Sequence, residues 1–103
     1  TASKKEILSF IKGFEDSKNT FLYGQRYWFA TILYIRFKGE GCICYQPIDN
    51  HFAWRYCGAL YDASGELPLS HEEKQNWLPW EYYRITYPYE SQRIEHDCIL
   101  KKG

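Results

Sequence analysis

Aromatic side chains are the feature that most constrains what this chain can fold into. Its 103 residues include 6 Phe, 4 Trp and 10 Tyr, which makes 20 aromatic residues. Each aromatic side chain buries roughly 150–250 Å² inside a protein. A chain of this length supports one compact domain, residues 1–103, with a hydrophobic core that needs no metal or disulfide staples. Because such a domain cannot hide 20 rings, we expect some of them to line a surface groove.

The charge balance narrows the class of partner. The 13 Lys and Arg residues are matched by 13 Asp and Glu residues, so the formal net charge is zero. A neutral chain lacks the long-range positive field that draws proteins to phosphate backbones. This argues against nucleic acid as a partner, although stacking of Tyr and Trp on single strands stays as a third hypothesis.

Two absences in the sequence bear on localisation. Residues 1–6 lead directly into an amphipathic segment, without the basic leader, apolar stretch and cleavage site of an exported protein. The longest nearly apolar stretch, residues 27–35, has about half of the roughly 20 residues that a membrane span needs. We therefore expect a cytoplasmic protein with no membrane association.

The four cysteines favour reduced thiols. Cys42 and Cys44 are two residues apart on a predicted strand, so they point to one face and are too cramped to bridge each other. Their spacing relative to Cys57 and Cys98 matches no zinc signature. We expect no metal and no cofactor, with disulfides and metal binding as the alternatives.

Two helices are predicted before the first strand. Ser3 and Glu6 form a capping box, and apolar residues then follow on one helical stripe that ends near Gly13. Residues 25–37 are apolar around almost the whole helical wheel, which is typical of a central, buried helix. Their β-branched content leaves a strand as the alternative, but 13 residues are long for a strand.

The remaining pattern predicts an antiparallel sheet followed by short helices. Residues 42–45 form one strand, residues 51–56 and 59–62 form a hairpin around Cys57-Gly58, and residues 67–69 are a further candidate. A second capping box at Ser70 opens a short helix toward Trp77, and residues 90–100 have a helical pattern. The expected fold class is α+β, with the sheet packed against the central N-terminal helix.

His51 and Asp62 are the two acid–base candidates that the hairpin brings together. With a two-residue loop at positions 57–58, position 53 faces Asp62, and His51 lies on that same face, two residues away. The carboxylate is then a diagonal cross-strand neighbour within reach of the imidazole. Such an aspartate orients a histidine in nucleophile–base–orienter sets. The alternative is that both side chains only cap turns at strand ends.

Several short motifs resemble a known family. The sequence reads GQRYWFA at positions 24–30, HF at 51–52 and YD at 61–62, with Gly65 just after, and it closes on DCILK at 97–101. This pattern resembles a group of small bacterial and prophage proteins with a papain-like, transglutaminase-like cysteine-peptidase core. The resemblance covers about three-quarters of the chain, from position 24 to the end.

The resemblance implies a site in which the nucleophile is missing. In that pattern a cysteine at the helix N-terminus is the nucleophile, the histidine is the base and the aspartate orients it. His51 and Asp62 carry over, but Arg26 stands where the cysteine would be. A guanidinium cannot attack a carbonyl, and it carries the wrong charge for a helix N-terminus. It can pair with Asp62, bind an anionic ligand or an acidic partner side chain, or extend into solvent.

These observations predict a non-catalytic accessory protein of the papain-like class. We expect it to bind a protein partner or a small anionic ligand in a cleft around Arg26, His51 and Asp62. The expected remaining cleft residues are Gly24, Trp28, Tyr61 and Trp80. The alternative is a cysteine hydrolase or acyltransferase that uses Cys42 or Cys44 with His51 as base. The aromatic tract at residues 77–89 is expected to complete the core, with partner contact as its alternative role.

Overall fold

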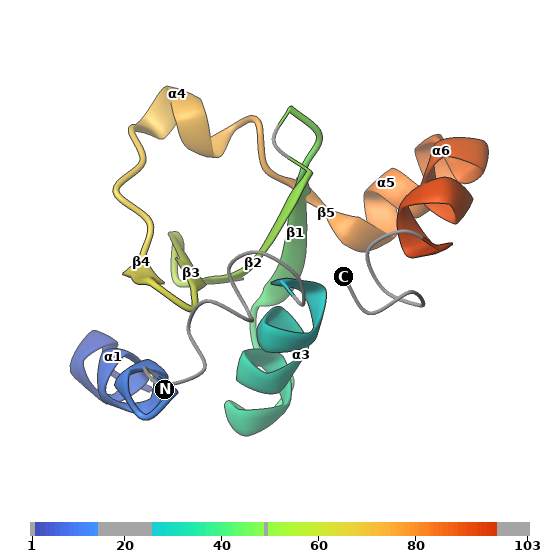
Figure 1. The fold of residues 1–103 in the computed structure, drawn as a ribbon. Helices are drawn as coiled ribbons and strands as arrows, with labels where there is room; N and C mark the ends of the chain where they lie inside the picture. Colours follow the sequence, from blue (N-terminus) through green and yellow to red (C-terminus); the bar gives the residue numbers. More distant parts are fainter. Residues whose placement is uncertain (1, 15–25, 49, 97–103) are drawn as a thin grey trace.

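The computed structural model describes residues 2–14, 26–48 and 50–96 of the chain. Figure 1 shows helices and strands arranged around one central sheet. In chain order they are α1 (Lys4–Lys12), α3 (Arg26–Arg36), β1 (Cys42–Gln46), β2 (His51–Tyr56), β3 (Ala59–Asp62), β4 (Gly65–Glu66), α4 (His71–Lys74), β5 (Leu78–Pro79), α5 (Trp80–Thr86) and α6 (Pro88–Ile94). The α+β class with an antiparallel sheet is therefore confirmed.

The sheet has five strands in the order β4-β3-β2-β1-β5, and every neighbouring pair is antiparallel. Its centre is the β2–β3 hairpin, in which Tyr56 is paired with Ala59 as the two-residue loop predicts. Cys57 and Gly58 both have positive φ, 50° and 80°. This is the backbone that a tight hairpin turn needs to match the twist of its strands.

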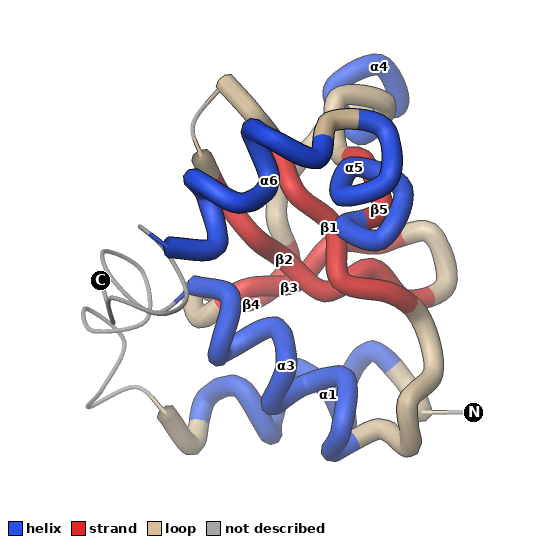
Figure 2. Tube along the Cα trace, turned by 90° about the vertical axis from the view of Figure 1, so that its right-hand side faces the viewer, coloured by secondary structure: helices blue, strands red, loops and turns tan. Residues whose placement is uncertain are grey.

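Two helices cover one face of the sheet. In both views α1 and α3 lie below the sheet, while α4, α5 and α6 lie higher (Figures 1 and 2). Ser3 caps α1 by accepting a hydrogen bond from the Glu6 N–H at 3.1 Å. The largest core cluster joins these two helices to the strands through Ile7, Ile11, Phe29, Ala30, Leu33, Phe37, Trp54, Tyr56, Ala59, Tyr61 and Ala63.

The helix predicted at residues 25–37 is present, but the prediction that it is buried on all sides is wrong. Its buried residues Phe29, Ala30 and Leu33 occupy one side. Trp28 is 40% exposed and Ile35 is 69% exposed. Because the sheet and α1 reach only one side of α3, the apolar residues on its other side stay at the surface of the described chain.

The aromatic tract supplies a second core cluster. Trp80, Tyr83 and Ile94 from α5 and α6 pack against Tyr45 and Phe52 of the sheet. Their rings lie close, with centroids 5.3 Å apart for Trp80 and Tyr45. The same helices leave other large apolar side chains exposed, namely Tyr82, Ile85, Tyr87 and Tyr89. The helical pattern at residues 90–100 begins earlier than predicted, at Pro88. Its last residues, 97–100, lie outside the described part.

The opposite face of the sheet is covered by the segment between β4 and β5. Trp77 packs there on Cys44, Ala53 and Leu60, and the half-buried Leu67 and Leu69 contact this cluster. Residues 67–69 were a further strand candidate, but β4 is shorter and begins earlier, at Gly65. Beyond β4 the Leu67 N–H continues the pairing by donating to the Leu60 carbonyl at 2.8 Å. The second capping box is confirmed at the start of α4. Among the described residues, no helix combines the length and hydrophobicity needed to cross a membrane.

Candidate functional site

The strand register brings His51 and Asp62 together as the sequence predicts. The His51 Nε2 atom lies 3.0 Å from the Asp62 Oδ2 atom, and the two side chains are 18% and 7% exposed. Nε2 is buried, and it has no well-aligned hydrogen bond among the described residues. The ring packs edge-to-face on Trp77, with centroids 5.2 Å apart. The pair is thus a close electrostatic contact in which Trp77 helps to hold the imidazole.

Asp62 also organises the turn that follows β3. Its Oδ1 atom accepts a hydrogen bond from the Ser64 N–H at 2.8 Å and another from the Ser64 hydroxyl. Burial raises the pKa of Asp62, but the contacts with His51 and Ser64 outweigh burial and hold the pKa below its usual value. Asp62 is therefore a carboxylate at neutral pH, and it both caps the turn and faces the histidine.

The turn before β2 places Arg26 beside the start of this site. Asn50 has a φ of 53°, a conformation that asparagine tolerates, and its side-chain oxygen accepts a hydrogen bond from the Tyr45 hydroxyl. The Arg26 Nη1 atom donates to the Asn50 carbonyl at 3.5 Å. The guanidinium is therefore bound to the residue that directly precedes His51.

Arg26 and Asp62 do not pair with one another. Among the described residues the ion pair of Asp62 is with His51. A cause is the alternation of β2, which directs His51 and Phe52 to opposite faces. The α3 helix packs on the Phe52 side, where Tyr27 meets the Phe52 ring with centroids 5.3 Å apart. Of the arrangements considered for Arg26, a salt bridge that draws Asp62 away from His51 is thus wrong.

The other residues expected to line the cleft are dispersed. Trp28 is exposed in the first turn of α3, and its ring lies 5.3 Å from Tyr27. Tyr61 is buried in the largest core cluster and Trp80 in the second, because their rings pack on neighbouring aromatic side chains. Gly24 lies outside the described residues. Tyr61 and Trp80 therefore do not line a common cleft in the described structure.

No nucleophile meets His51 within residues 2–14, 26–48 and 50–96. The described contacts of its side chain are the ion pair with Asp62 and the ring contact with Trp77. Cys57 is exposed in the hairpin turn. The Cys44 sulfur lies against Cys42, with 3.6 Å between the Sγ atoms. Among the described residues His51 and Asp62 thus lie together, but neither a thiol nor a hydroxyl hydrogen-bonds to the imidazole.

The Cys42–Cys44 pair has its own electrostatics. A hydrogen bond from Cys44, aided by the charge of Arg55, outweighs partial burial and lowers the pKa of Cys42 to about 6. The same contact and burial raise the pKa of Cys44. All three side chains share the sheet face that carries His51, because Cys42 is directly opposite Arg55 in the register. No cluster of three or more metal-ligating side chains occurs among the described residues.

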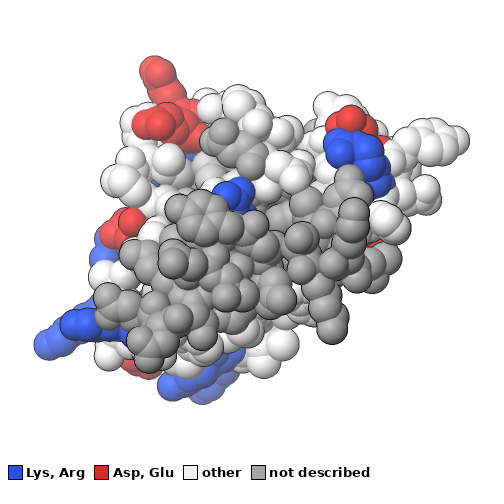
Figure 3. Space-filling model, in the orientation of Figure 1, with Lys and Arg blue, Asp and Glu red and all other residues white. Residues whose placement is uncertain are grey.

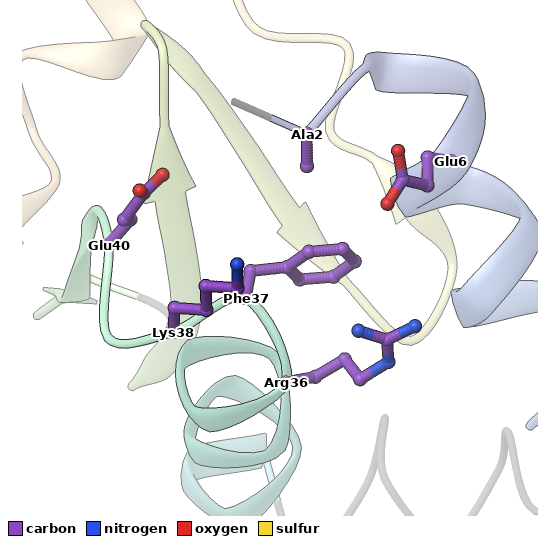
Figure 4. Close-up of a pocket in the computed structure, with 6 residues that line it drawn as sticks. All are labelled: Ala2, Glu6, Arg36, Phe37, Lys38 and Glu40. Carbon is purple, nitrogen blue, oxygen red and sulfur yellow. The ribbon is translucent and has the colours of Figure 1, made fainter.

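The structure also contains a polar cavity that the sequence did not indicate. It has a volume of about 200 Å³ and lies where the start of α1 meets the end of α3. Figure 4 shows the Phe37 ring among the lining residues, with Glu6 above it and Arg36 below it in the view. Arg36 is held over the Phe10 and Phe37 rings, 5.3 Å from each centroid. Because its lining comes from segments about 30 residues apart, no local motif points to it.

Charged side chains on the described surface form small groups of either sign. In Figure 3, Lys and Arg atoms and Asp and Glu atoms form several small groups, some of which adjoin a group of the opposite sign. In the part of this face that is described, they do not merge into one continuous basic surface. This distribution agrees with the zero net charge.

Comparisons of the chain with family models, with curated proteins and with solved structures gave no match. The arguments for function therefore depend on the site itself.

Proposed function

We propose that this protein is a non-catalytic binding domain that recognises an acidic side chain of a protein partner at the start of β2. The supporting observation is an assembled His51–Asp62 pair at which the described residues place no nucleophile, together with Arg26, whose guanidinium donates to the carbonyl of Asn50, the residue before His51. In the papain-like interpretation this is a pseudoenzyme, in which Arg26 replaces the nucleophilic cysteine. The α+β architecture is compatible with that interpretation.

The chemistry of Arg26 suits an anionic partner. Its planar guanidinium presents several N–H donors that match a carboxylate in a bidentate way. Trp28, two residues further along α3 and 40% exposed, offers a large ring with a polar N–H. Arg and Trp are enriched among the residues that dominate binding energy at protein interfaces. We infer that these two side chains form the contact and that His51 borders it.

Binding of a carboxylate probe tests the proposal. A short glutamate-rich peptide is titrated into the isotope-labelled protein while the backbone amide signals and the arginine Nε–H signals are followed. We expect saturable shifts at Arg26 and His51. Arg26→Gln should weaken the peptide about 10-fold or more, because hydrogen bonds to charged groups contribute about 1.5–3 kcal/mol. Arg36→Gln, at the other end of the same helix, is the matched control and should bind normally.

Two outcomes contradict the proposal. The first is the absence of saturable shifts near Arg26 in a folded sample. The second is an equal loss of binding in the Arg26 and Arg36 variants, which indicates a general charge effect rather than a site.

The hydrolase alternative is tested by alkylation of the thiols. Cys42 should react fastest with iodoacetamide near pH 7, because its pKa is lowered to about 6 by Cys44 and Arg55. His51 has no part in that effect, so His51→Gln should leave the rate at Cys42 unchanged, while Arg55→Gln should slow it. Peptide mass spectrometry measures each rate. A clear fall in the His51 variant instead identifies His51 as the base of a working cysteine and overturns the non-catalytic proposal.

A further inference from the structure

We propose that Cys42 and Cys44 form a two-thiolate site for a soft monovalent metal ion of the Cu(I) class. They are alternate residues of β1, so their side chains leave the strand on the same face. Their sulfur atoms are 3.6 Å apart. The sulfurs are in contact, so a small side-chain rotation must separate them before one metal ion can lie between them. Because a single strand holds both donors, this rearrangement costs little chain entropy. This site is independent of Arg26 and His51.

The number of ligands selects the kind of metal ion. Thiolates are soft ligands that favour Cu(I), zinc and iron–sulfur centres. Structural zinc takes four protein ligands in a tetrahedron. The described residues offer no cluster of three or more metal-ligating side chains. Because a soft monovalent ion is satisfied by two thiolates, the pair fits Cu(I) and its analogue Ag(I) better than Zn(II).

The two cysteines differ in their exposure to solvent. Cys44 is 0% exposed, in the cluster that contains Ala53, Leu60 and Trp77. This apolar shell keeps water from one side of the site. Cys42 is partly exposed. Cys42 thus gives an ion a route from solvent, and Cys44 anchors it.

Arg55 balances the charge of the loaded site. Two thiolates and one monovalent cation carry one net negative charge, and the register places Arg55 directly opposite Cys42. A guanidinium at that position offsets the charge without being a ligand. Outer partners of this kind typically change metal affinity about 10–100-fold. Arg55 is therefore a positioning residue for this site, acting through the thiolates.

Metal titration of the full chain tests the inference. The background carries Cys57→Ser and Cys98→Ser, so that the pair supplies the only thiols. Ag(I) is added to the reduced protein in chloride-free buffer and followed by ultraviolet absorption of the metal–thiolate bond and by native mass spectrometry. We expect one ion per chain. Restoring Cys57 should leave this high-affinity step unchanged, which makes it the matched control for a lone exposed thiol.

Single substitutions separate the roles. Cys42→Ser removes the more exposed sulfur and should weaken Ag(I) by more than about 100-fold, a larger loss than that of an outer partner. Arg55→Gln should weaken it about 10–100-fold, and Arg55→Lys should restore most of the affinity. Circular dichroism shows whether each variant is folded, and Cys42→Ala repeats the test if the serine variant is not.

Three results would overturn the inference. One is a folded Cys42→Ser variant that binds Ag(I) as tightly as the background. Another is a stoichiometry of half an ion per chain, which indicates bridging between molecules. The last is a higher affinity for Zn(II) than for Cu(I) in competition with the same chelator.

Discussion

Replacing Asp62 with asparagine removes its charge while keeping its shape, and the consequence for stability depends on pH. The carboxylate is 7% exposed, lies 3.0 Å from His51 Nε2 and accepts two hydrogen bonds from Ser64. Bonds to a charged group contribute about 1.5–3 kcal/mol each. Because the asparagine oxygen can still accept from Ser64, we expect Asp62→Asn to lower the free energy of unfolding by about 2–3 kcal/mol at pH 7.

The sign of the pH dependence follows from the lowered pKa of Asp62 in the folded state. Its stabilising contribution is complete above the unfolded-state pKa of about 3.9. The contribution is lost as the pH falls through the lower folded-state pKa, where the protonated acid is as uncharged as the amide. The difference between wild type and Asp62→Asn should therefore persist down to about pH 5 and shrink below about pH 4.

Urea unfolding followed by tryptophan fluorescence measures this difference at each pH. With a slope of about 1.5 kcal/mol per molar urea, the midpoint at pH 7 should fall by about 1.3–2 M. Glu66→Gln is the matched control, because Glu66 pairs with Lys4 at 2.9 Å on the surface, where screening leaves little effect. An unchanged midpoint for Asp62→Asn, or a gap of constant size down to pH 3, would refute the reasoning.

Packing of the sheet gives two further predictions, both measured by urea unfolding. A Cβ added at Gly41 would lie 2.2 Å from the Arg55 carbonyl oxygen, whereas at Gly58 nothing lies within 4 Å, and both glycines have positive φ. Gly58→Ala should lower the free energy of unfolding by about 1–2 kcal/mol, because alanine disfavours a left-handed backbone. Gly41→Ala should lower it by about 2–5 kcal/mol, because the added Cβ also clashes with the Arg55 carbonyl. Equal losses for the two variants would contradict the clash at Gly41. Leu33→Ala, at a side chain with 0% exposure, should cost about 2–5 kcal/mol, and a loss below about 1 kcal/mol means that α3 does not pack as described.

The hairpin was predictable because its information is local. A two-residue turn fixes the register, and the alternation of a strand fixes the face, so the sequence alone places His51 diagonal to Asp62. The structure has both the register and the contact. The same logic predicts that Cys42 and Cys44 share a face, since they are alternate residues of one strand. Local spacing thus anticipated the geometry of both chemical pairs.

Exposure and long-range contacts were not predictable in this way. A helical wheel counts apolar residues but does not show what covers them, so Ile35 was expected inside and lies at the surface. Trp80 packs on Tyr45 and Phe52, about 30 residues earlier, and no local signal connects these positions. An aromatic tract therefore predicts a contribution to the hydrophobic core, but it does not show which of its rings will be buried. The polar cavity beside Arg36 was missed for the same reason.

The two faces of the sheet differ in what their side chains do. In β2, Phe52, Trp54 and Tyr56 pack against helices, and the residues between them face the other way. That second face carries both chemical pairs, His51–Asp62 and Cys42–Cys44, under a thinner cover that includes Trp77. Because one register fixes both pairs, a substitution that shifts it disturbs the histidine and the thiols together, whereas a change confined to Trp77 bears most directly on the imidazole that its ring contacts. Packing of the helices on the first face thus stabilises the strand register that positions both pairs on the second face.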